Sequence, residues 1–224
     1  MGEYYRWVNV DRKEYICPND FDFGNKKHES MGRGNTFLCA LRELLSKEWA
    51  ANHVIFMGDE QPVLADSDNK TLRILYGHTV QAGHPEDAFD TVIDTYKNVS
   101  GLFKAAEVIV RQEIRWFLED LKNNAPMMYN EYGVNILNPF DGLFLRNGQD
   151  FRYTVNHTKR VYYSFEETKI LCLDHTENNF ADPLPILMGY GRISETGAWV
   201  GDVIGVGDEI PEGYKLLKEI YLDW

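Results

Sequence analysis

Two stretches of this chain, 149 residues apart, have nearly the same sequence. Residues 54–62 read VIFMGDEQP and residues 203–211 read VIGVGDEIP, so the Val-Ile pair, the Gly-Asp-Glu triplet and the proline coincide. A tryptophan precedes each stretch, Trp49 in the first and Trp199 in the second. A chain with such a match is expected to contain two units of similar fold.

A second, weaker match lies upstream and has nearly the same offset. Residues 8–15 (VNVDRKEY) resemble residues 155–162 (VNHTKRVY), which lie 147 positions later. Both matches occur in the same order along the chain, which chance rarely arranges. We therefore interpret the chain as an internal duplication.

The length and composition are those of a globular protein. With 224 residues, 44% of them hydrophobic, the chain can bury a core as one large domain or two small ones. It has no apolar run long enough to span a membrane, and its first residues lack the pattern of a signal peptide. Three cysteines without close spacing suit a reducing compartment. We expect a cytoplasmic protein that does not contact membranes.

The net charge is −12, from 23 basic and 35 acidic residues. Binding to a phosphate backbone needs clustered Lys and Arg, so this balance opposes nucleic-acid binding. An acidic surface is instead compatible with simple solubility, with a basic protein partner, or with a bound cation.

The first unit is predicted to begin with a β-hairpin over residues 4–17, with its turn at residues 11–13. A short helix follows, with Asn35 or Thr36 as its N-cap and leucines along one face. A buried strand over residues 53–57 then leads into the Gly-Asp-Glu turn.

The second unit follows the same plan, with a hairpin over residues 151–165. Residues 184–188 take the place of the helix, although Pro185 opposes a full helix there. A strand follows Trp199. The tail over residues 214–224 is compatible with either a short helix or an edge strand.

A mainly helical insert is expected between the two units. Residues 85–87 open one helix, and Ser100 caps a longer one that ends near residues 123–126. Apolar residues recur on both helices at spacings of three and four, so the insert should pack against the rest of the protein.

These elements predict an α+β fold. Two hairpin-strand units would form an antiparallel sheet, with the helical insert packed against it. The prediction is one domain over residues 1–224, with the first repeat at about 4–62, the insert at about 84–125 and the second repeat at about 151–211. Two separate small domains are the alternative. The expected core positions are the matched apolar residues of the two units: Trp49, Val54, Ile55, Trp199, Val203 and Ile204.

The twin Gly-Asp-Glu turns are the strongest candidates for chemistry. If the repeats face each other, Asp59, Glu60, Asp208 and Glu209 would converge and could bind a ligand or a divalent cation, or act as acid and base. The competing interpretation is structural, because aspartates often hydrogen-bond the backbone of their own turn.

Asn9 and Asn156 form a second repeated polar pair, and they too are candidates for ligand binding or for local backbone bonding. Residues 31–35 (MGRGN) are interpreted as a flexible loop, with anion binding as the alternative. The six histidines have no metal-ligand spacing, and no nucleotide-binding, hydrolase or kinase motif occurs. The sequence therefore predicts no metal site and no cofactor, and names no catalytic residue.

The opening MGEYYRWVN and the stretch from Trp49 to Asp59 resemble an uncharacterised family of bacterial proteins with an MGxYYxWVN start and repeated W…VIxxGDExP units. In some of its members a single such unit stands alone. The resemblance covers the two repeated units and not the insert. It implies no activity, because the family has no assigned function.

Two functions remain open at this level. The first is a non-enzymatic protein-interaction module of the immunity or inhibitor kind, which would expose a patch of acids mixed with tyrosine or tryptophan. The second is a ligand-binding or divalent-metal-binding protein, or a hydrolase, with a carboxylate site between the repeats. The sequence leaves open whether the protein is an enzyme, what its partner or substrate is, and its oligomeric state.

Overall fold

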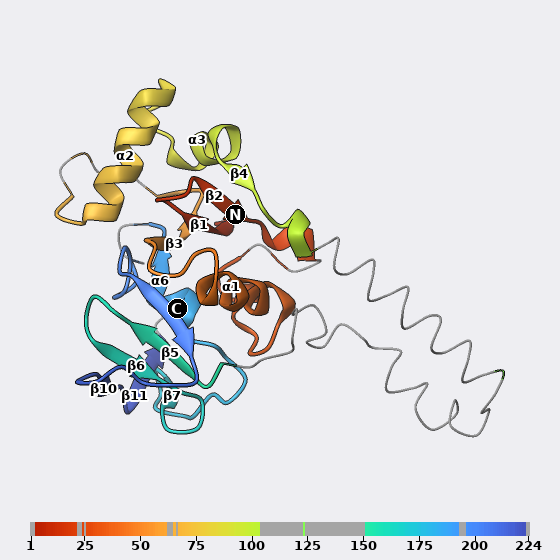
Figure 1. The fold of residues 1–224 in the computed structure, drawn as a ribbon, viewed down its shortest axis with the longest axis vertical. Coiled ribbons are helices and arrows are strands. Elements are labelled where there is room, and N and C mark those ends of the chain that lie inside the picture. Colours follow the sequence, from red (N-terminus) through yellow and green to blue (C-terminus); the bar gives the residue numbers. More distant parts are fainter. Residues whose placement is uncertain are drawn as a thin grey trace.

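The computed structural model describes residues 3–21, 24, 26–61, 65, 67–103, 123, 151–192 and 196–222. Within these residues helices and strands are mixed along the chain, so the protein is α+β (Figure 1). The longer helix predicted after Ser100 begins among the described residues and otherwise lies outside them.

The first sheet has five strands in the order β4-β2-β1-β3-β8. They are β1 (Tyr5–Asn9), β2 (Glu14–Ile16), β3 (Val54–Gly58), β4 (Lys97–Asn98) and β8 (Gly189–Tyr190). The three central strands are antiparallel, as predicted, whereas β4 and β8 pair in parallel at the two edges. The second half of the chain thus supplies an edge strand to the first sheet.

The second sheet has four strands in the order β10-β6-β5-β9, and a separate two-stranded sheet pairs β11 with β7. The strands are β5 (Tyr153–Asn156), β6 (Val161–Tyr163), β7 (Lys169–Cys172), β9 (Ile204–Gly207), β10 (Lys215–Leu216) and β11 (Glu219–Leu222). Of the two alternatives for the tail, the strand is the one observed.

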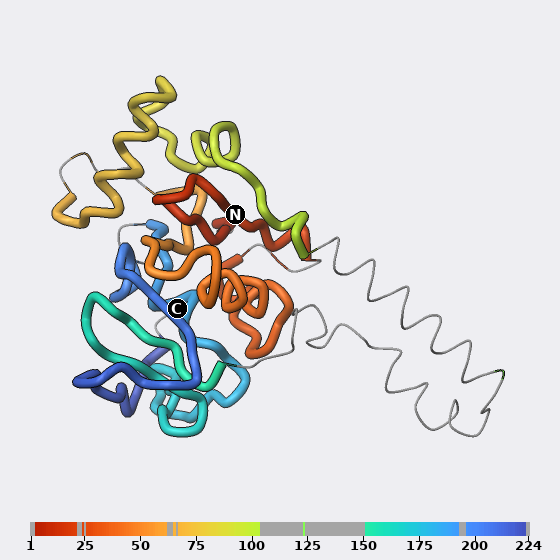
Figure 2. Tube along the Cα trace, viewed as in Figure 1, coloured from red at the N-terminus to blue at the C-terminus, as the bar shows by residue number. Residues whose placement is uncertain are grey.

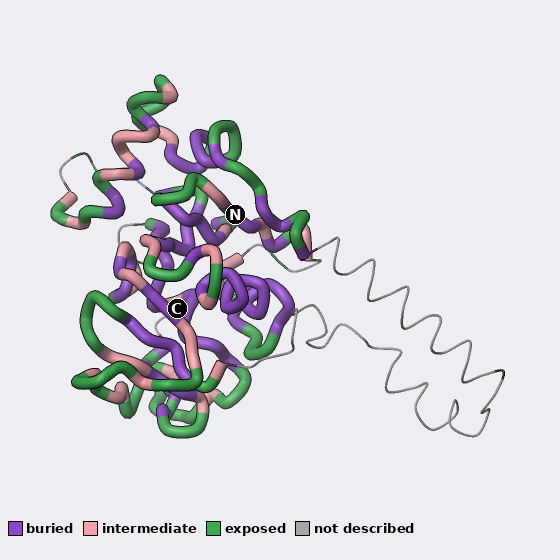
Figure 3. Tube along the Cα trace, in the orientation of Figure 1, coloured by how far each residue is buried: buried purple, intermediate pink, exposed green. Residues whose placement is uncertain are grey.

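Helices lie between and beside the sheets. They are α1 (Thr36–Ser46), α2 (Lys70–Ala82), α3 (Ala88–Thr95), the short α6 (Leu184–Met188), and the 3-10 helices η1 (Pro18–Phe21) and η2 (Glu29–Met31). Helix α1 lies between the two larger sheets, and its residues from Thr36 to Leu45 are all buried (Figures 2 and 3). This position explains why α1 has apolar side chains on more than one face.

Asparagine caps define where α1 and α2 begin. The side chain of Asn35 accepts a hydrogen bond from the Leu38 amide at 2.8 Å, and that of Asn69 accepts from the Thr71 amide at 3.0 Å. Helix α2 ends at Gly83, whose φ of 86° is a left-handed conformation that glycine adopts without strain.

The first sheet is covered on both faces. Trp7 and Phe56 face α1 and share a core with residues of the second unit, whereas Val8 and Ile55 on adjacent positions pack with α2 and α3. Alternate residues of a strand point to opposite faces, so all five residues of β3 are buried.

The strands of the two larger sheets pair in the same pattern. In each, the first strand pairs antiparallel with the second and the third, and a later strand pairs in parallel with the second. Each unit also has a corresponding backbone hydrogen bond beyond the end of its central strands. The Val10 amide donates to the His53 carbonyl at 3.0 Å, and the His157 amide donates to the Val203 carbonyl at 2.9 Å. These are the pairings that two units of one fold would have.

The central ladder is one residue shorter in the second unit. β1 and β3 have five residues each, whereas β5 and β9 have four. The sequence offset therefore falls from 150 at the two tryptophans to 149 at the Gly-Asp-Glu turns. Consequently Ile204 occupies the place opposite Asn156 that Val54 occupies opposite Asn9.

Five of the six expected core residues are buried, and Val203 is half-buried. Val203 forms an isolated antiparallel bridge with His53, so the starts of β3 and β9 lie side by side. The sequence match aligned Val203 with Val54 and so predicted a buried position, because it did not allow for the residue that the ladder of the second unit lacks.

Helices α2 and α3 lie within the first unit, between β3 and β4, over residues 59–96. The corresponding connection between β9 and β10 spans only residues 208–214. The helical insert therefore begins before residue 84, and helix α2 is an element that the sequence analysis did not predict. Its signals, a cap asparagine and a terminal glycine, are present in the sequence.

Candidate functional site

The aspartate of each Gly-Asp-Glu turn hydrogen-bonds the backbone of its own sheet. The carboxylate of Asp59 accepts a hydrogen bond from the Tyr4 amide at 2.9 Å, and that of Asp208 accepts from the Arg152 amide at 3.2 Å. Both aspartates thus bond the backbone at the start of the neighbouring first strand. The structural interpretation of the turns accounts for both contacts.

The two turns do not meet. The bridge between His53 and Val203 is antiparallel, so β3 and β9 leave it in opposite directions. At a rise of about 3.3 Å per residue, the turns lie on the order of 30 Å apart. Glu60 pairs with Arg192, and Glu209 is exposed. No group of three or more His, Cys, Asp or Glu side chains that could hold a metal ion occurs among the described residues.

Asn9 and Asn156 stabilise the two hairpin turns. The side-chain oxygen of Asn9 accepts a hydrogen bond from the Arg12 amide at 3.0 Å, and that of Asn156 accepts from the Lys159 amide at 2.8 Å. Both asparagines are fully buried. Their position leaves no surface for a ligand, and their role in the turns is structural.

The side-chain amide of each asparagine also reaches the turn before the third strand. The side-chain amide of Asn9 donates to Asn52 at 3.0 Å, and that of Asn156 donates to Asp202 at 2.7 Å. Substituting either Asn9 or Asn156 by alanine is expected to lower the free energy of unfolding by about 1–3 kcal/mol, because the hydrogen bonds that this buried side chain makes to two turns are lost. Urea unfolding measures this, with the exposed Asn179→Ala as the control. A loss below about 0.5 kcal/mol at either position would contradict the assignment.

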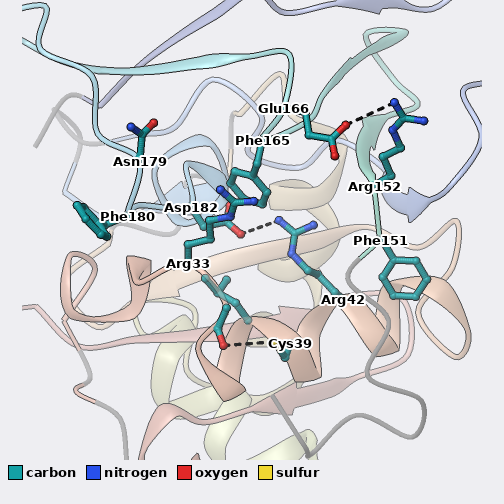
Figure 4. A pocket seen from close by; sticks show the side chains of 12 residues that line it. Arg33, Cys39, Arg42, Phe151, Arg152, Phe165, Glu166, Asn179, Phe180 and Asp182 are labelled. Atoms are coloured by element: carbon teal, nitrogen blue, oxygen red, sulfur yellow. Dashed lines mark hydrogen bonds and ion pairs between the residues drawn. The ribbon is translucent and has the colours of Figure 1, made fainter. Parts of the chain in front are cut away.

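A pocket among the described residues combines charged and aromatic side chains and has a volume of about 640 Å³ (Figure 4). It lies between α1 and the start of the second unit. Its lining includes three arginines and three phenylalanines: Arg33, Arg42, Arg152, Phe151, Phe165 and Phe180.

A buried ion pair forms the inner wall of this pocket. The Arg42 guanidinium donates to Asp182 at 2.6 Å and to Thr154 at 2.7 Å, and the Tyr163 hydroxyl donates to Asp182 at 2.9 Å. Burial by itself lowers the pKa of Arg42. The interactions with Asp182 and Tyr163 together have the larger effect, so the pKa of Arg42 is raised. Burial, followed by the negative charge of Asp182, raises the pKa of Tyr163. The network is therefore a charged pair with a neutral tyrosine.

The first unit has an apolar pair where the second has part of this network. Trp7 pairs across the strands with Ile16, and the corresponding pair in the second unit is Thr154 with Tyr163. Both polar residues bond Arg42, which belongs to the first unit. The polar wall of the pocket is thus a feature in which the two units differ.

The other two arginines lie toward the mouth of the pocket. The Arg33 guanidinium lies 3.9 Å from the ring centre of Phe165, and that of Arg42 lies 5.5 Å from the same ring. Arg152 pairs with Glu166 at 3.4 Å, and both side chains are more than half exposed. The guanidinium groups of Arg33 and Arg152 are thus accessible to solvent.

A second feature is an exposed patch on β11 and the loop that follows β7. We name it the Tyr221 patch. Its members are Leu173, Asp174, His175, Glu177, Glu219 and Tyr221, all of which are exposed.

Strand pairing and side-chain contacts place Glu177, His175 and Glu219 near Tyr221. Leu171 is opposite Tyr221 on one side and forms a bridge with Glu177 on the other. The His175 ring contacts the Tyr221 ring at 5.5 Å, and the Tyr221 hydroxyl donates to Glu219 at 3.3 Å. Glu219 and Tyr221 alternate on β11 and therefore share a face of the small sheet, and the ring contact places His175 beside Tyr221.

The patch carries negative charge. The hydroxyl and backbone amide of Thr176 donate to Asp174 and hold the pKa of that carboxyl below its ordinary value. Glu177 is partly neutralised by Lys169 at 2.9 Å, an exposed ion pair. The patch therefore combines acids with an aromatic and an aliphatic side chain.

Sequence patterns indicated Arg33 only as part of the loop at residues 31–35, and no pattern predicted a role for Arg42 or Asp182. Arg42 lies 140 positions from Asp182, so no local pattern predicts their contact. The one available signal was that Arg42, next to Glu43, lies within a mostly apolar helical stretch.

Comparisons with protein-family models, curated proteins and solved structures find no match to this chain. Among the described residues, no helix is both long and apolar enough to cross a membrane.

Proposed function

We propose that this protein is a non-enzymatic protein-interaction module of the immunity or inhibitor kind, which binds a basic protein through the Tyr221 patch. The observation that carries the proposal is the exposed face on which Tyr221 lies beside His175 and Glu219, with Leu173, Asp174 and Glu177 exposed on the loop that follows β7. Aromatic residues are enriched in interface cores, and charged residues suit the rim.

The charge of the whole chain supports a basic partner. A net charge of −12 attracts a cationic surface and speeds its association, and it opposes binding to nucleic acid. We place this function in the cytoplasm, as the cysteine content suggests.

Affinity capture with matched variants tests the proposal. We expect the wild type and Tyr4→Ser to retain the same basic protein, and the double variant Leu173→Ser/Tyr221→Ser to bind it at least tenfold more weakly. Tyr4 is a matched control because it is half-exposed and lies on the first unit, away from the patch. With the purified partner, affinity should fall as salt rises.

The proposal fails if no protein is retained, or if every retained protein binds the double variant as tightly as the wild type. A partner whose affinity does not respond to salt would also contradict it, because charge attraction would then contribute nothing.

The alternative hypothesis is a carboxylate site between the repeats. It gains no support, because Asp59 and Glu60 lie far from Asp208 and Glu209. Each aspartate has a backbone partner of its own.

We also propose that the chain is one domain that arose by internal duplication. The shared connectivity of the two sheets supports this, as do the paired roles of Asn9 and Asn156. The common core, which contains Trp49 and Trp199, supports a single domain.

A further inference from the structure

We propose that the pocket beside α1 binds a small organic anion, in which a carboxylate or phosphate is attached to a flat apolar group. Its volume of about 640 Å³ is in the range of pockets that bind small molecules. The pocket is separate from the Tyr221 patch, and this inference does not rest on the proposed interaction with a protein.

The charge of the lining selects an anion. Acidic residues outnumber basic ones in the whole chain, 35 to 23, yet the pocket is lined by three arginines and two acids, Glu166 and Asp182. Asp182 neutralises Arg42, which leaves Arg33 and Arg152 facing a single exposed carboxylate. The local balance is thus positive on an otherwise acidic protein.

Arg33 is the cation that a ligand would meet without displacing another group. Among the described residues its guanidinium makes a stacking contact with Phe165 at 3.9 Å and has neither an ion pair nor a hydrogen bond. Stacking fixes the plane of the guanidinium and leaves its N–H edge for a bidentate contact with carboxylate or phosphate. Arg152 can join it, because its exposed pair with Glu166 contributes little.

The aromatic lining selects a flat apolar body. Phe151, Phe165 and Phe180 line the same pocket, and Phe180 is 86% exposed although it is a large apolar ring. A flat group packed against Phe180 would bury this ring and gain the stacking energy of an aromatic pair. In Figure 4 Phe165 lies close to the Arg33 side chain at the centre of the lining, whereas Phe180 and Phe151 lie on opposite sides of it.

Calorimetric titration with three probes tests this site. Phenyl phosphate and benzoate carry the anion and the ring, and benzyl alcohol carries the ring alone. We expect saturable binding of both anions to the wild type and none of benzyl alcohol. Arg33→Gln should weaken anion binding about tenfold or more, because a charged hydrogen-bonded contact is lost.

Arg73→Gln is the matched control. Arg73 is exposed on α2 and outside the pocket, so its removal changes the net charge equally and should leave binding unchanged. Inorganic phosphate should bind more weakly than phenyl phosphate, which separates recognition of the ring from recognition of the anion.

Three results would overturn the proposal. They are the absence of saturation by either anion up to about 10 mM, equal affinities in the wild type and Arg33→Gln, and equal weakening by Arg33→Gln and Arg73→Gln. The Leu173→Ser/Tyr221→Ser variant should bind the anions normally, so failure of this site and failure of the proposed protein interaction are distinguishable.

Discussion

Replacing Asp182 by asparagine is expected to lower the free energy of unfolding by on the order of 3–5 kcal/mol, because it leaves the Arg42 guanidinium buried without its counter-charge. The side chains of Arg42 and Asp182 are 9% and 2% exposed, so water cannot take the place of the lost carboxylate. Asparagine keeps the size of the side chain and can still accept from the Leu184 amide, as Asp182 does at 3.0 Å. The loss therefore reports the charge. Urea unfolding, followed by circular dichroism, measures it.

Two controls make this result specific. Glu177→Gln removes the charge from an exposed pair with Lys169 and should change stability by less than about 1 kcal/mol. The double variant Arg42→Met/Asp182→Asn should be more stable than Asp182→Asn alone, since it removes the unpaired charge. A loss below about 1 kcal/mol for Asp182→Asn would show that the pair is solvated and that the inner wall of the pocket is not as described.

Substituting either Trp49 or Trp199 by alanine is expected to cost about 3–5 kcal/mol of unfolding free energy. The two side chains are 0% and 3% exposed and belong to the same core. The Trp49 indole also donates to Glu14 at 2.9 Å, a bond that alanine cannot make. Trp49→Ala should therefore be at least as damaging as Trp199→Ala.

Denaturant unfolding of both variants checks this prediction, with Tyr4→Ala as the control. Tyr4 is 50% exposed, and its loss should cost less than about 0.5 kcal/mol. If one tryptophan variant were destabilised and the other unchanged, the two units would not share a core.

Local patterns predicted much of the fold. The hairpins of both units, the Asn35 cap and the strand after Trp49 follow from strand propensity, capping and apolar spacing, all of which act within a few residues. The α+β class follows from these elements. Helix α2 was missed although Asn69 and Gly83 mark its ends.

Long-range features could not be predicted in this way. The edge strand β8 pairs with β3 across more than a hundred residues, and the Arg42 network joins α1 to β5, β6 and the loop before α6. No periodicity in the sequence encodes such contacts. The expected convergence of the acidic turns assumed that the repeats face each other, whereas the His53–Val203 bridge places the turns at opposite ends.

The two units have the same backbone hydrogen bonds beside their central strands, and hydrogen-bond scalar couplings in a deuterated sample detect each of these bonds individually. We expect couplings from the Val10 amide to the His53 carbonyl and from the His157 amide to the Val203 carbonyl, at comparable strength, because the N···O distances are 3.0 and 2.9 Å. Detection of the coupling in one unit and its absence from the other would contradict the account.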